Sequence, residues 1–519
     1  MLTALKKFLH PKHRIDPDLG SSQQLPDNVW LNIFMHLPFR DRVRLSRVSR
    51  QFQKIYIWAI RNTKEFDQAL GPFSSVPIQS RSMVLGMCSA KLARLVLRMD
   101  EIPLEHASMI AATYWPNLLL VFLFFDNLPV PIFHQLLANC PKLRLLLLSS
   151  SEKTTFNCRC ENVRRVELIN CNDSLIEAVA RNFPNLKTLG LFRQLNADSD
   201  AESPVVKCPN VRRLIFGSLY YDQLPVEIQC DKVKFVRVFY CPLEFIDSIV
   251  QRYPNVKILR IGLDIMPNEE SMNRLLGAMS NVESLKIRHF DVLSWAFGSL
   301  PNLKNMRFLR DLVLVGMYFI TDSLFQVLSI HCIFLERLLV MGMALRPVKE
   351  EVTNRGIKAL TNLTRLHEFT FQRHRPKTSL DSGIRALAKC GRLVRTNLQS
   401  EVFSRRTAMS FLKYCPNLKR LKIRSIKRVE SVSAVLKLLH DIKRLNNRQR
   451  RLEILFLCRA QIKWIWTSKA VFAALDRMNS VFEGPRLYIT AKHRSKSMNM
   501  SVSSDSDKIV TDLETTDDE

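Results

Sequence analysis

One spacing of apolar residues recurs along most of this chain. A turn that often reads Pro-Asn comes first, and the pattern apolar-x-x-apolar-x-apolar follows it. The clearest copies are Pro116–Leu123, Pro184–Leu191, Pro254–Ile261 and Pro416–Ile423, and copies without the proline are Asn281–Ile287 and Leu335–Val340. Because side chains alternate along a strand, the end of each copy predicts a short strand that buries two apolar residues on one face.

Helix-like stretches lie between the strand positions. They are Pro131–Asn139, Ser174–Asn182, Glu244–Arg252, Asn268–Met279, Ser323–His331 and Thr407–Tyr414. Most consecutive strand positions are about 20 to 27 residues apart, a period similar to that of leucine-rich repeats. Each unit would then be a strand followed by a helix, and it would bury its apolar face only by stacking on its neighbours.

A different pattern occupies the N-terminal region. Val29, Ile33, Phe34 and Leu37 recur at helical spacing, which predicts a short amphipathic helix that ends at Pro38. A second helix is expected from Asp41, a candidate N-cap. Its apolar positions stand among basic residues and are Val43, Leu45, Val48, Phe52 and Ile55. We expect a helical hairpin with too little core to fold alone.

This hairpin resembles the F-box. The matching positions are Leu25-Pro26, Ile33-Phe34, Leu37-Pro38, Leu45-Ser46 and Val48. Three positions depart from the family pattern: Asp27 replaces Glu, Ser49 replaces Cys and Phe52 replaces Trp. The resemblance implies binding to the Skp-type adaptor and, through it, to the cullin and RING subunits of SCF ubiquitin ligases. The residues implied in adaptor binding are Leu25, Pro26, Val29, Ile33, Phe34, Leu37, Pro38, Leu45, Val48 and Phe52.

Together these patterns predict an α/β chain with an N-terminal helical F-box and a leucine-rich-repeat solenoid. Short parallel strands would line the concave face and helices the convex face. The segment from Ile320 to Cys332 also resembles the cysteine-containing repeats of F-box proteins. The expected domains are a flexible basic leader (1–22), the F-box (23–70), a linker or first capping segment (71–91), the solenoid (92–494) and a disordered acidic Ser/Thr-rich tail (495–519).

Length and composition add bounds to this picture. The 519 residues are 47% hydrophobic, but the longest apolar runs, Leu118–Phe125 and Leu145–Leu148, are too short to cross a bilayer. Met1–Leu9 shows no secretory signal, so we expect a cytoplasmic or nuclear protein. Several of the twelve cysteines occupy equivalent repeat positions, which favours buried thiols in a reducing compartment. They are Cys140, Cys208, Cys332, Cys390 and Cys415.

A zinc site is the alternative for a second group of cysteines. Cys158, Cys160 and Cys171 are close together in the sequence, but no second Cys-x-x-Cys or His pair completes a ligand set. Packing in the core is therefore favoured, and no metal or cofactor is expected.

The net charge of +29 is the strongest anomaly of the composition. Beyond residue 504 the chain holds seven acidic residues and one lysine, so residues 1–504 carry +35. A surface this basic attracts nucleic acid, acidic or phosphorylated proteins, or anionic lipid. A basic scaffold that binds nucleic acid or acidic partners independently of ubiquitination is therefore an alternative function, although we do not favour nucleic acid.

The middle position of each strand predicts which side chains face outward from the solenoid. In chain order these are Val96, Phe122, Leu147, Glu167, Gly190, Ile215, Arg237, Arg260, Lys286, Val313, Leu339, Thr370, Asn397, Lys422, Phe456 and Tyr488. Arg237, Arg260 and Lys286, joined by Arg288, would form a row of like charges that an acidic or phosphorylated ligand would relieve. A solvated basic face without a ligand is equally compatible with the pattern.

Apolar residues in the same columns are a second candidate for target binding. They are Phe122, Phe124 and Leu147 in one region and Val313, Leu339 and Met341 in another. Exposed apolar patches of this kind mark protein contacts, but a loop or a neighbouring segment could equally cover them.

Catalytic motifs are missing from the sequence. Neither a GxxxxGK[ST] loop, a strand-bound GxGxxG nor an HExxH helix occurs. The sequence therefore favours a non-enzymatic adaptor that brings a protein target to an SCF-type ubiquitin ligase.

Overall fold

The structure is a computed structural model. It describes residues 25–68, 73–74, 76–99, 102–124, 129–149, 156–169, 173–192, 205–217, 227–240, 243–263, 269–289, 301–316, 320–342, 352–373, 379–400, 405–425, 440, 453–458 and 487–490. The expected basic leader and acidic tail lie outside these residues. The chain divides into two compact units, Met1–Leu338 and Leu339–Glu519.

The described part of the first unit begins with three helices rather than the expected hairpin. They are α2 (Asp27–His36), α3 (Phe39–Ser46) and α4 (Arg50–Arg61). The prediction of one helix from Asp41 to Ile55 is wrong because the chain leaves the helical conformation between α3 and α4. Ser49 is extended there, and its hydroxyl accepts a hydrogen bond from the Phe52 amide at 3.1 Å, so Ser49 is the N-cap of a new helix.

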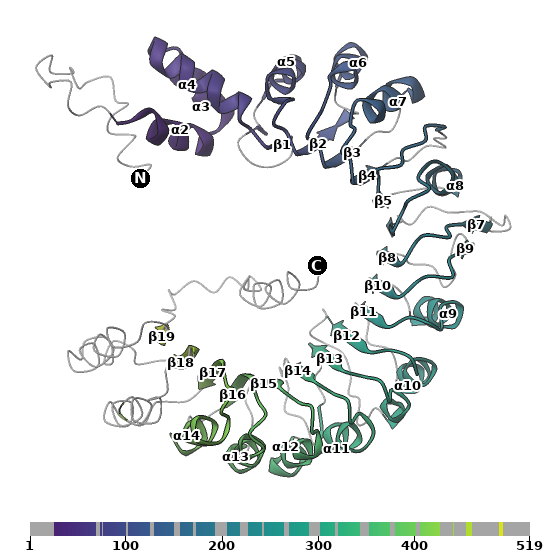
Figure 1. Cartoon of the computed structure of the whole chain (residues 1–519), viewed down its shortest axis with the longest axis vertical. Helices are drawn as coiled ribbons and strands as arrows, with labels where there is room; N and C mark the ends of the chain where they lie inside the picture. Colours follow the sequence, from purple (N-terminus) through teal and green to yellow (C-terminus); the bar gives the residue numbers. More distant parts are fainter. Residues whose placement is uncertain are drawn as a thin grey trace, which may run out of the picture. The chain divides into compact units, whose positions relative to one another are not determined.

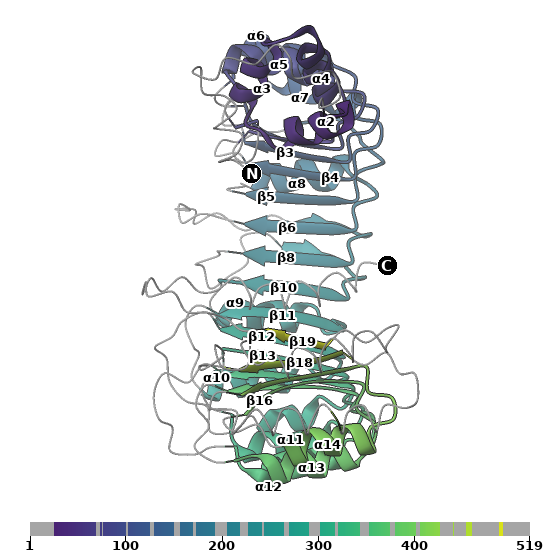
Figure 2. The ribbon, with the colours of Figure 1, turned by 90° about the vertical axis from the view of Figure 1, so that its left-hand side faces the viewer.

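The strands of the first unit form one parallel sheet in which each strand pairs with the next of the row. In that order they are β1 (Glu65–Asp67), β2 (Arg94–Arg98), β3 (Leu120–Phe124), β4 (Leu145–Ser149), β5 (Arg165–Ile169), β6 (Thr188–Phe192), β8 (Arg213–Gly217), β10 (Phe235–Phe239), β11 (Ile258–Leu263), β12 (Ser284–His289) and β13 (Asp311–Val315). Figure 2 shows many of them as a ladder of parallel arrows. The row starts with β1, which precedes residue 92, the expected start of the solenoid.

Helices cover one face of this sheet. Figure 1 shows α5 (Ile78–Cys88), α6 (Leu104–Ala112), α7 (Val130–Ala138), α8 (Asp173–Asn182), α9 (Leu243–Arg252) and α10 (Glu269–Ala278) on the same side of the strands. The unit also contains a 3-10 helix, η3 (Pro301–Asn305), and α11 (Asp322–His331). The helices expected in α7 to α11 are confirmed to within one or two residues.

Two successive repeats use a short strand where most of the described repeats have a helix. β7 (Val205–Lys207) precedes β8 and β9 (Glu227–Gln229) precedes β10, and the two pair in parallel as a separate small sheet. Their β-branched residues, Val205, Val206 and Ile228, suit the extended conformation.

The second unit repeats the same plan. Its strands β15 (Glu368–Arg373), β16 (Arg395–Ser400), β17 (Arg420–Ser425), β18 (Glu453–Cys458) and β19 (Leu487–Thr490) pair in parallel in chain order. Helices α12 (Asn354–Ala359), α13 (Asp381–Lys389) and α14 (Arg405–Tyr414) lie on one side of them (Figure 1), and a 3-10 turn, η4 (Leu360–Asn362), follows α12. β14 (Arg337–Gly342) crosses the boundary between the units.

One predicted strand register in the second unit is wrong. Lys422 pairs with Leu455 rather than with Phe456, and Leu455 pairs in turn with Tyr488. The four apolar residues 454–457 give no alternation of apolar and polar positions, so the sequence pattern cannot choose between the two faces of this strand.

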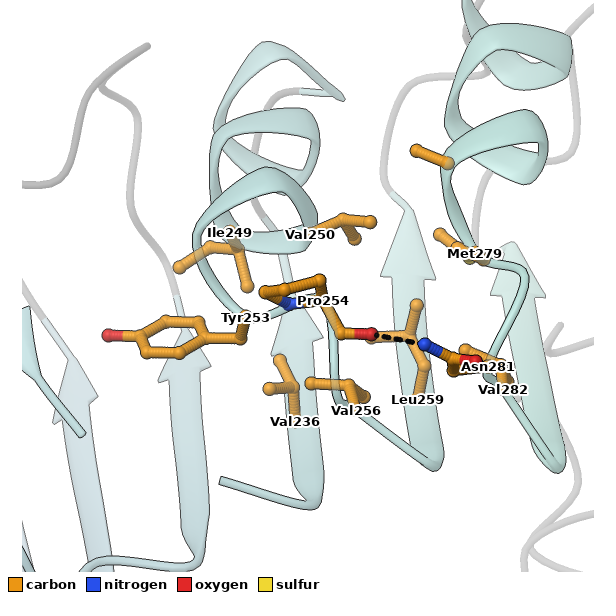
Figure 3. Close-up of a pocket in the computed structure, with 11 residues that line it drawn as sticks. Val236, Ile249, Val250, Tyr253, Pro254, Val256, Leu259, Met279, Asn281 and Val282 are labelled. Atoms are coloured by element: carbon orange, nitrogen blue, oxygen red, sulfur yellow. Dashed lines mark hydrogen bonds between the residues drawn. The ribbon is translucent and has the colours of Figure 1, made fainter. Parts of the chain in front are cut away.

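The Pro-Asn turns tie consecutive repeats together. Asn185 donates through Nδ2 to the Glu161 carbonyl oxygen of the preceding repeat at 3.0 Å. The other bonds of this asparagine ladder run from Asn117 to Ala90, Asn162 to Pro141, Asn210 to Pro184 and Asn281 to Pro254. Figure 3 shows the bond from Asn281 beside the apolar side chains that fill the seam between two repeats. The cavity there measures about 10 Å³, which is at most enough for one water molecule.

Buried cysteines connect the repeats as well. Cys140, Cys208, Cys332 and Cys415 are buried as predicted, and Cys390 is half-buried. The thiols donate weakly to carbonyls one repeat earlier, at 3.7 Å from Cys332 Sγ to Leu303 O and 3.3 Å from Cys415 Sγ to Ala388 O.

The described residues contain neither a cluster of metal-ligating side chains nor a membrane-spanning helix. No group of three or more metal-ligating side chains comes together there, and Cys171 of the candidate zinc group lies outside those residues. Within the same part of the chain, no helix is sufficiently long and apolar for a membrane span.

Candidate functional site

Helix α2 has two apolar faces that serve different purposes. Its inner face, which includes Trp30 and Phe34, packs in a small core with Leu45 of α3 and Ile55 of α4. A second apolar stripe lies outside this core: Val29 and Ile33 are four residues apart on α2, and Leu25 lies directly before Pro26, the N-cap of the helix. Val29 and Ile33 are half-buried and Leu25 is 44% exposed, so this docking stripe offers apolar surface to a partner.

The other implied adaptor-binding residues divide between the core and the surface. Phe34 and Leu45 are buried, so they shape the three-helix domain and present little surface. Leu37 and Phe52 pack against them, and the Phe52 ring lies 4.7 Å from that of Trp30. The residues that remain exposed are Pro26, Pro38 and Val48, the last at 67%.

A buried arginine holds the loop between α2 and α3. Arg42, one of the basic residues that stand among the apolar positions of this segment, is fully buried. Its guanidinium donates to the carbonyl oxygens of Leu37 and Met35, both at 2.8 Å. No carboxylate pairs with Arg42 within the described ranges, and burial lowers the pKa of its side chain to about 10.

The same arginine connects the three helices to the first repeat. Its guanidinium lies 4.8 Å from the centre of the Phe73 ring, and this ring also contacts Phe39 of α3 and Phe66 of β1. The docking stripe is therefore carried on a domain packed against the start of the sheet. Sequence reasoning missed Arg42 because four other basic residues surround it in the sequence.

The predicted row of cations is present in the sheet of the first unit. Arg237 pairs in register with Arg260, and Arg260 pairs with Lys286. Arg288 stands two residues beyond Lys286 and therefore on the same face. All four side chains are half-buried, and we call them the basic row.

The apolar patches predicted on the same columns are less exposed than an open docking surface requires. Val313 and Leu339 are buried, the latter at 4% exposure, which agrees with the covered alternative. Val313 lies next to Lys286, whose long aliphatic stem can shield a short β-branched side chain. Phe122, Leu147 and Met341 are half-buried, and the side chain of Phe124 is not among those that the structure describes.

Comparisons with known proteins agree with the N-terminal geometry. Residues 22–55 match the F-box domain family, and this segment spans α2, α3 and the start of α4. The N-terminal helices are therefore an F-box domain. No curated protein matches the chain.

Solved structures show only distant similarity. A leucine-rich-repeat protein of Leptospira interrogans is 15% identical with a TM-score of 0.30, covering 70% of this chain and 79% of that chain. The mouse RP105/MD-1 complex is 11% identical with a TM-score of 0.34, covering 75% of this chain and 88% of that chain. The strand register and the spacing of the repeats are the features that identify the leucine-rich-repeat fold.

Proposed function

We propose that this F-box and leucine-rich-repeat protein is the substrate-recognition subunit of an SCF-type ubiquitin ligase. The F-box would bind a Skp-type adaptor and, through it, the cullin and RING subunits. The repeats would hold a protein target. The protein itself would catalyse no step, and its contribution would be to raise the effective concentration of target lysines near the charged ubiquitin carrier.

The F-box match carries this proposal, and the two faces of α2 support it. A domain of this size buries little apolar surface, and its exposed stripe of Leu25, Val29 and Ile33 would be covered by a partner.

The docking stripe is tested by replacing its three residues with alanine. The variant L25A/V29A/I33A should lose co-purification with the Skp-type adaptor because it removes apolar contact area without emptying the core of the domain. The measurement is a pull-down with purified adaptor, accompanied by circular dichroism to verify folding.

A control on the same helix separates docking from helix stability. The variant N32A/H36A changes two exposed positions of α2 and should bind the adaptor as wild type does. Full adaptor binding by a folded stripe variant would contradict the proposed function.

A further inference from the structure

We infer that the basic row, Arg237, Arg260, Lys286 and Arg288, binds an acidic segment of the protein target rich in Asp and Glu. This inference rests on the proposed function, because it names the class of target that the repeats would present to the ligase. Its own evidence is the charge and the aromatic packing of strands β8 to β12.

Charge is segregated along the sheet of the first unit. Strands β8, β10, β11 and β12 contain five Lys or Arg residues and not a single Asp or Glu. Parallel strands lie about 4.8 Å apart, so adjacent row members are like charges at short range. Carboxylates from a ligand would lower this repulsion and form charge-assisted hydrogen bonds.

The acidic residues that flank this region are already paired. On one side, Glu167 of β5 accepts from Arg165 Nε at 2.8 Å. On the other side, Asp311 of β13 accepts two hydrogen bonds from Arg337, each at 2.9 Å, and a third from Ser284. These contacts give both carboxylates cationic or hydroxyl partners of their own at the two sides of the basic region.

Aromatic rings hold the arginines of the region in place. The Arg260 and Arg213 guanidiniums lie 5.2 and 4.5 Å from the centre of the Phe235 ring. The Arg237 guanidinium lies 5.2 Å from the Phe239 ring. Guanidiniums that are positioned before binding lose less conformational entropy when they bind a carboxylate, which favours affinity.

The same packing favours an acidic peptide over nucleic acid. Single-stranded nucleic acid binds through bases stacked on aromatic faces. Phe235 is buried beneath two guanidiniums, and Phe239 contacts Phe192 and Tyr240 in addition to Arg237. Both phenylalanine rings are engaged by arginines, so they leave little surface for stacking bases, and the exposed ring beside them is Tyr240, at 36%.

A binding assay with the full-length protein tests the inference. The probe is a fluorescently labelled peptide of alternating Glu and Gly, and its control is the same peptide with Gln in place of Glu. We expect the Glu peptide to bind, measured by anisotropy, and the Gln peptide not to bind. The row variant R237Q/R260Q/K286Q should weaken binding by at least about tenfold, since charge-assisted hydrogen bonds are lost.

A matched variant controls for the loss of net charge. R181Q/R252Q/R274Q removes three exposed cations from helices α8, α9 and α10 and should change the affinity by less than about twofold. Equal weakening in both variants would overturn the inference, because binding would then follow total charge. Thermal unfolding of both variants verifies that they fold.

Other occupants of the row give distinct results. Stronger binding after deletion of residues 505–519 would assign the row to the chain's own acidic end. A requirement for phosphoserine in place of Glu, or tighter row-dependent binding of single-stranded RNA, would also overturn the inference.

Failure of the proposed function can be distinguished from failure of this inference. The stripe variant L25A/V29A/I33A should still bind the Glu peptide, and the row variant should still bind the adaptor.

Discussion

Arg42 shows how a charged residue can serve the interior of a small domain. Moving a cation out of water is costly, and here two carbonyl oxygens at the end of α2 and the face of Phe73 offset part of that cost. The sequence could not reveal this role because the surrounding basic residues have the same chemistry and differ only in their position on α3. Burial depends on the neighbouring Phe73, which is 31 residues away and outside any helical period.

Buried thiols are a second feature at the scale of residues. They make the free energy of unfolding depend on pH in the alkaline range. Burial raises the pKa of the Cys88, Cys140 and Cys332 thiols from their ordinary value near 9 to about 12. The folded state therefore keeps its protons to a higher pH than the unfolded chain does. The stabilisation by each thiol is complete below about pH 9 and is lost as the pH rises from about 9 to 12.

We expect this loss to be visible for Cys332. Between pH 9 and 12 the free energy of unfolding should decrease by up to about 1.4 kcal/mol per pH unit for each such thiol. Urea unfolding of wild type and C332A at several pH values measures it, because the stability advantage of wild type should shrink as the pH rises. A difference that stays constant across this range would show that ionisation of the thiol is not linked to unfolding.

At the scale of elements, the alternation of apolar and polar positions predicted most strands and their register. The register of the predicted column from Val96 to Val313 is confirmed pair by pair in the first unit, but Val96, Ile215 and Val313 are buried rather than exposed. The failures occur where alternation is absent, as in β18, or where the element is too short to show a period, as in β1, β7 and β9. The break between α3 and α4 was missed because it depends on one serine cap, and a serine also occurs within helices.

Gly217, the last residue of β8, provides a test of how side chains pack on the sheet. The rings of Phe192 and Phe239 meet with their centres 5.5 Å apart, and a Cβ placed on Gly217 would overlap the Phe239 ring and lie 2.7 Å from the Phe192 ring. The variant G217A should therefore destabilise the first unit by about 1 to 3 kcal/mol, since the two rings must separate.

Gly86 on helix α5 is the matched control for this substitution. A Cβ at that position meets no atom within 4 Å, so G86A should be neutral or stabilising by up to about 1 kcal/mol. Denaturant midpoints of the two variants provide the comparison. Equal stability of G217A and G86A would mean that the ring contact is not formed in solution.

At the scale of the whole molecule, the net charge of +29 produces attraction to any polyanion. We expect weak binding to single-stranded and duplex nucleic acid without sequence preference. Counterion release makes such binding fall steeply with salt, so it should be largely lost near physiological ionic strength. Filter binding over a salt series checks this, and tight, sequence-selective binding at physiological salt would support the nucleic-acid scaffold instead of the adaptor.

The asparagine ladder also determines which connections between helices and strands can accept inserted residues. Asn162, Asn185 and Asn210 each stand three positions before the first residue of a strand, as do Asn117 and Asn281. An insertion between asparagine and strand would break the bond to the preceding repeat, so insertions at this edge should destabilise the stack. At the opposite edge the connections vary, from Arg98–Leu104 to the much longer Phe192–Val205 and His289–Pro301. New segments acquired by descendants of this protein should therefore accumulate where the strands end, which leaves the stacking of repeats intact while the recognition properties change.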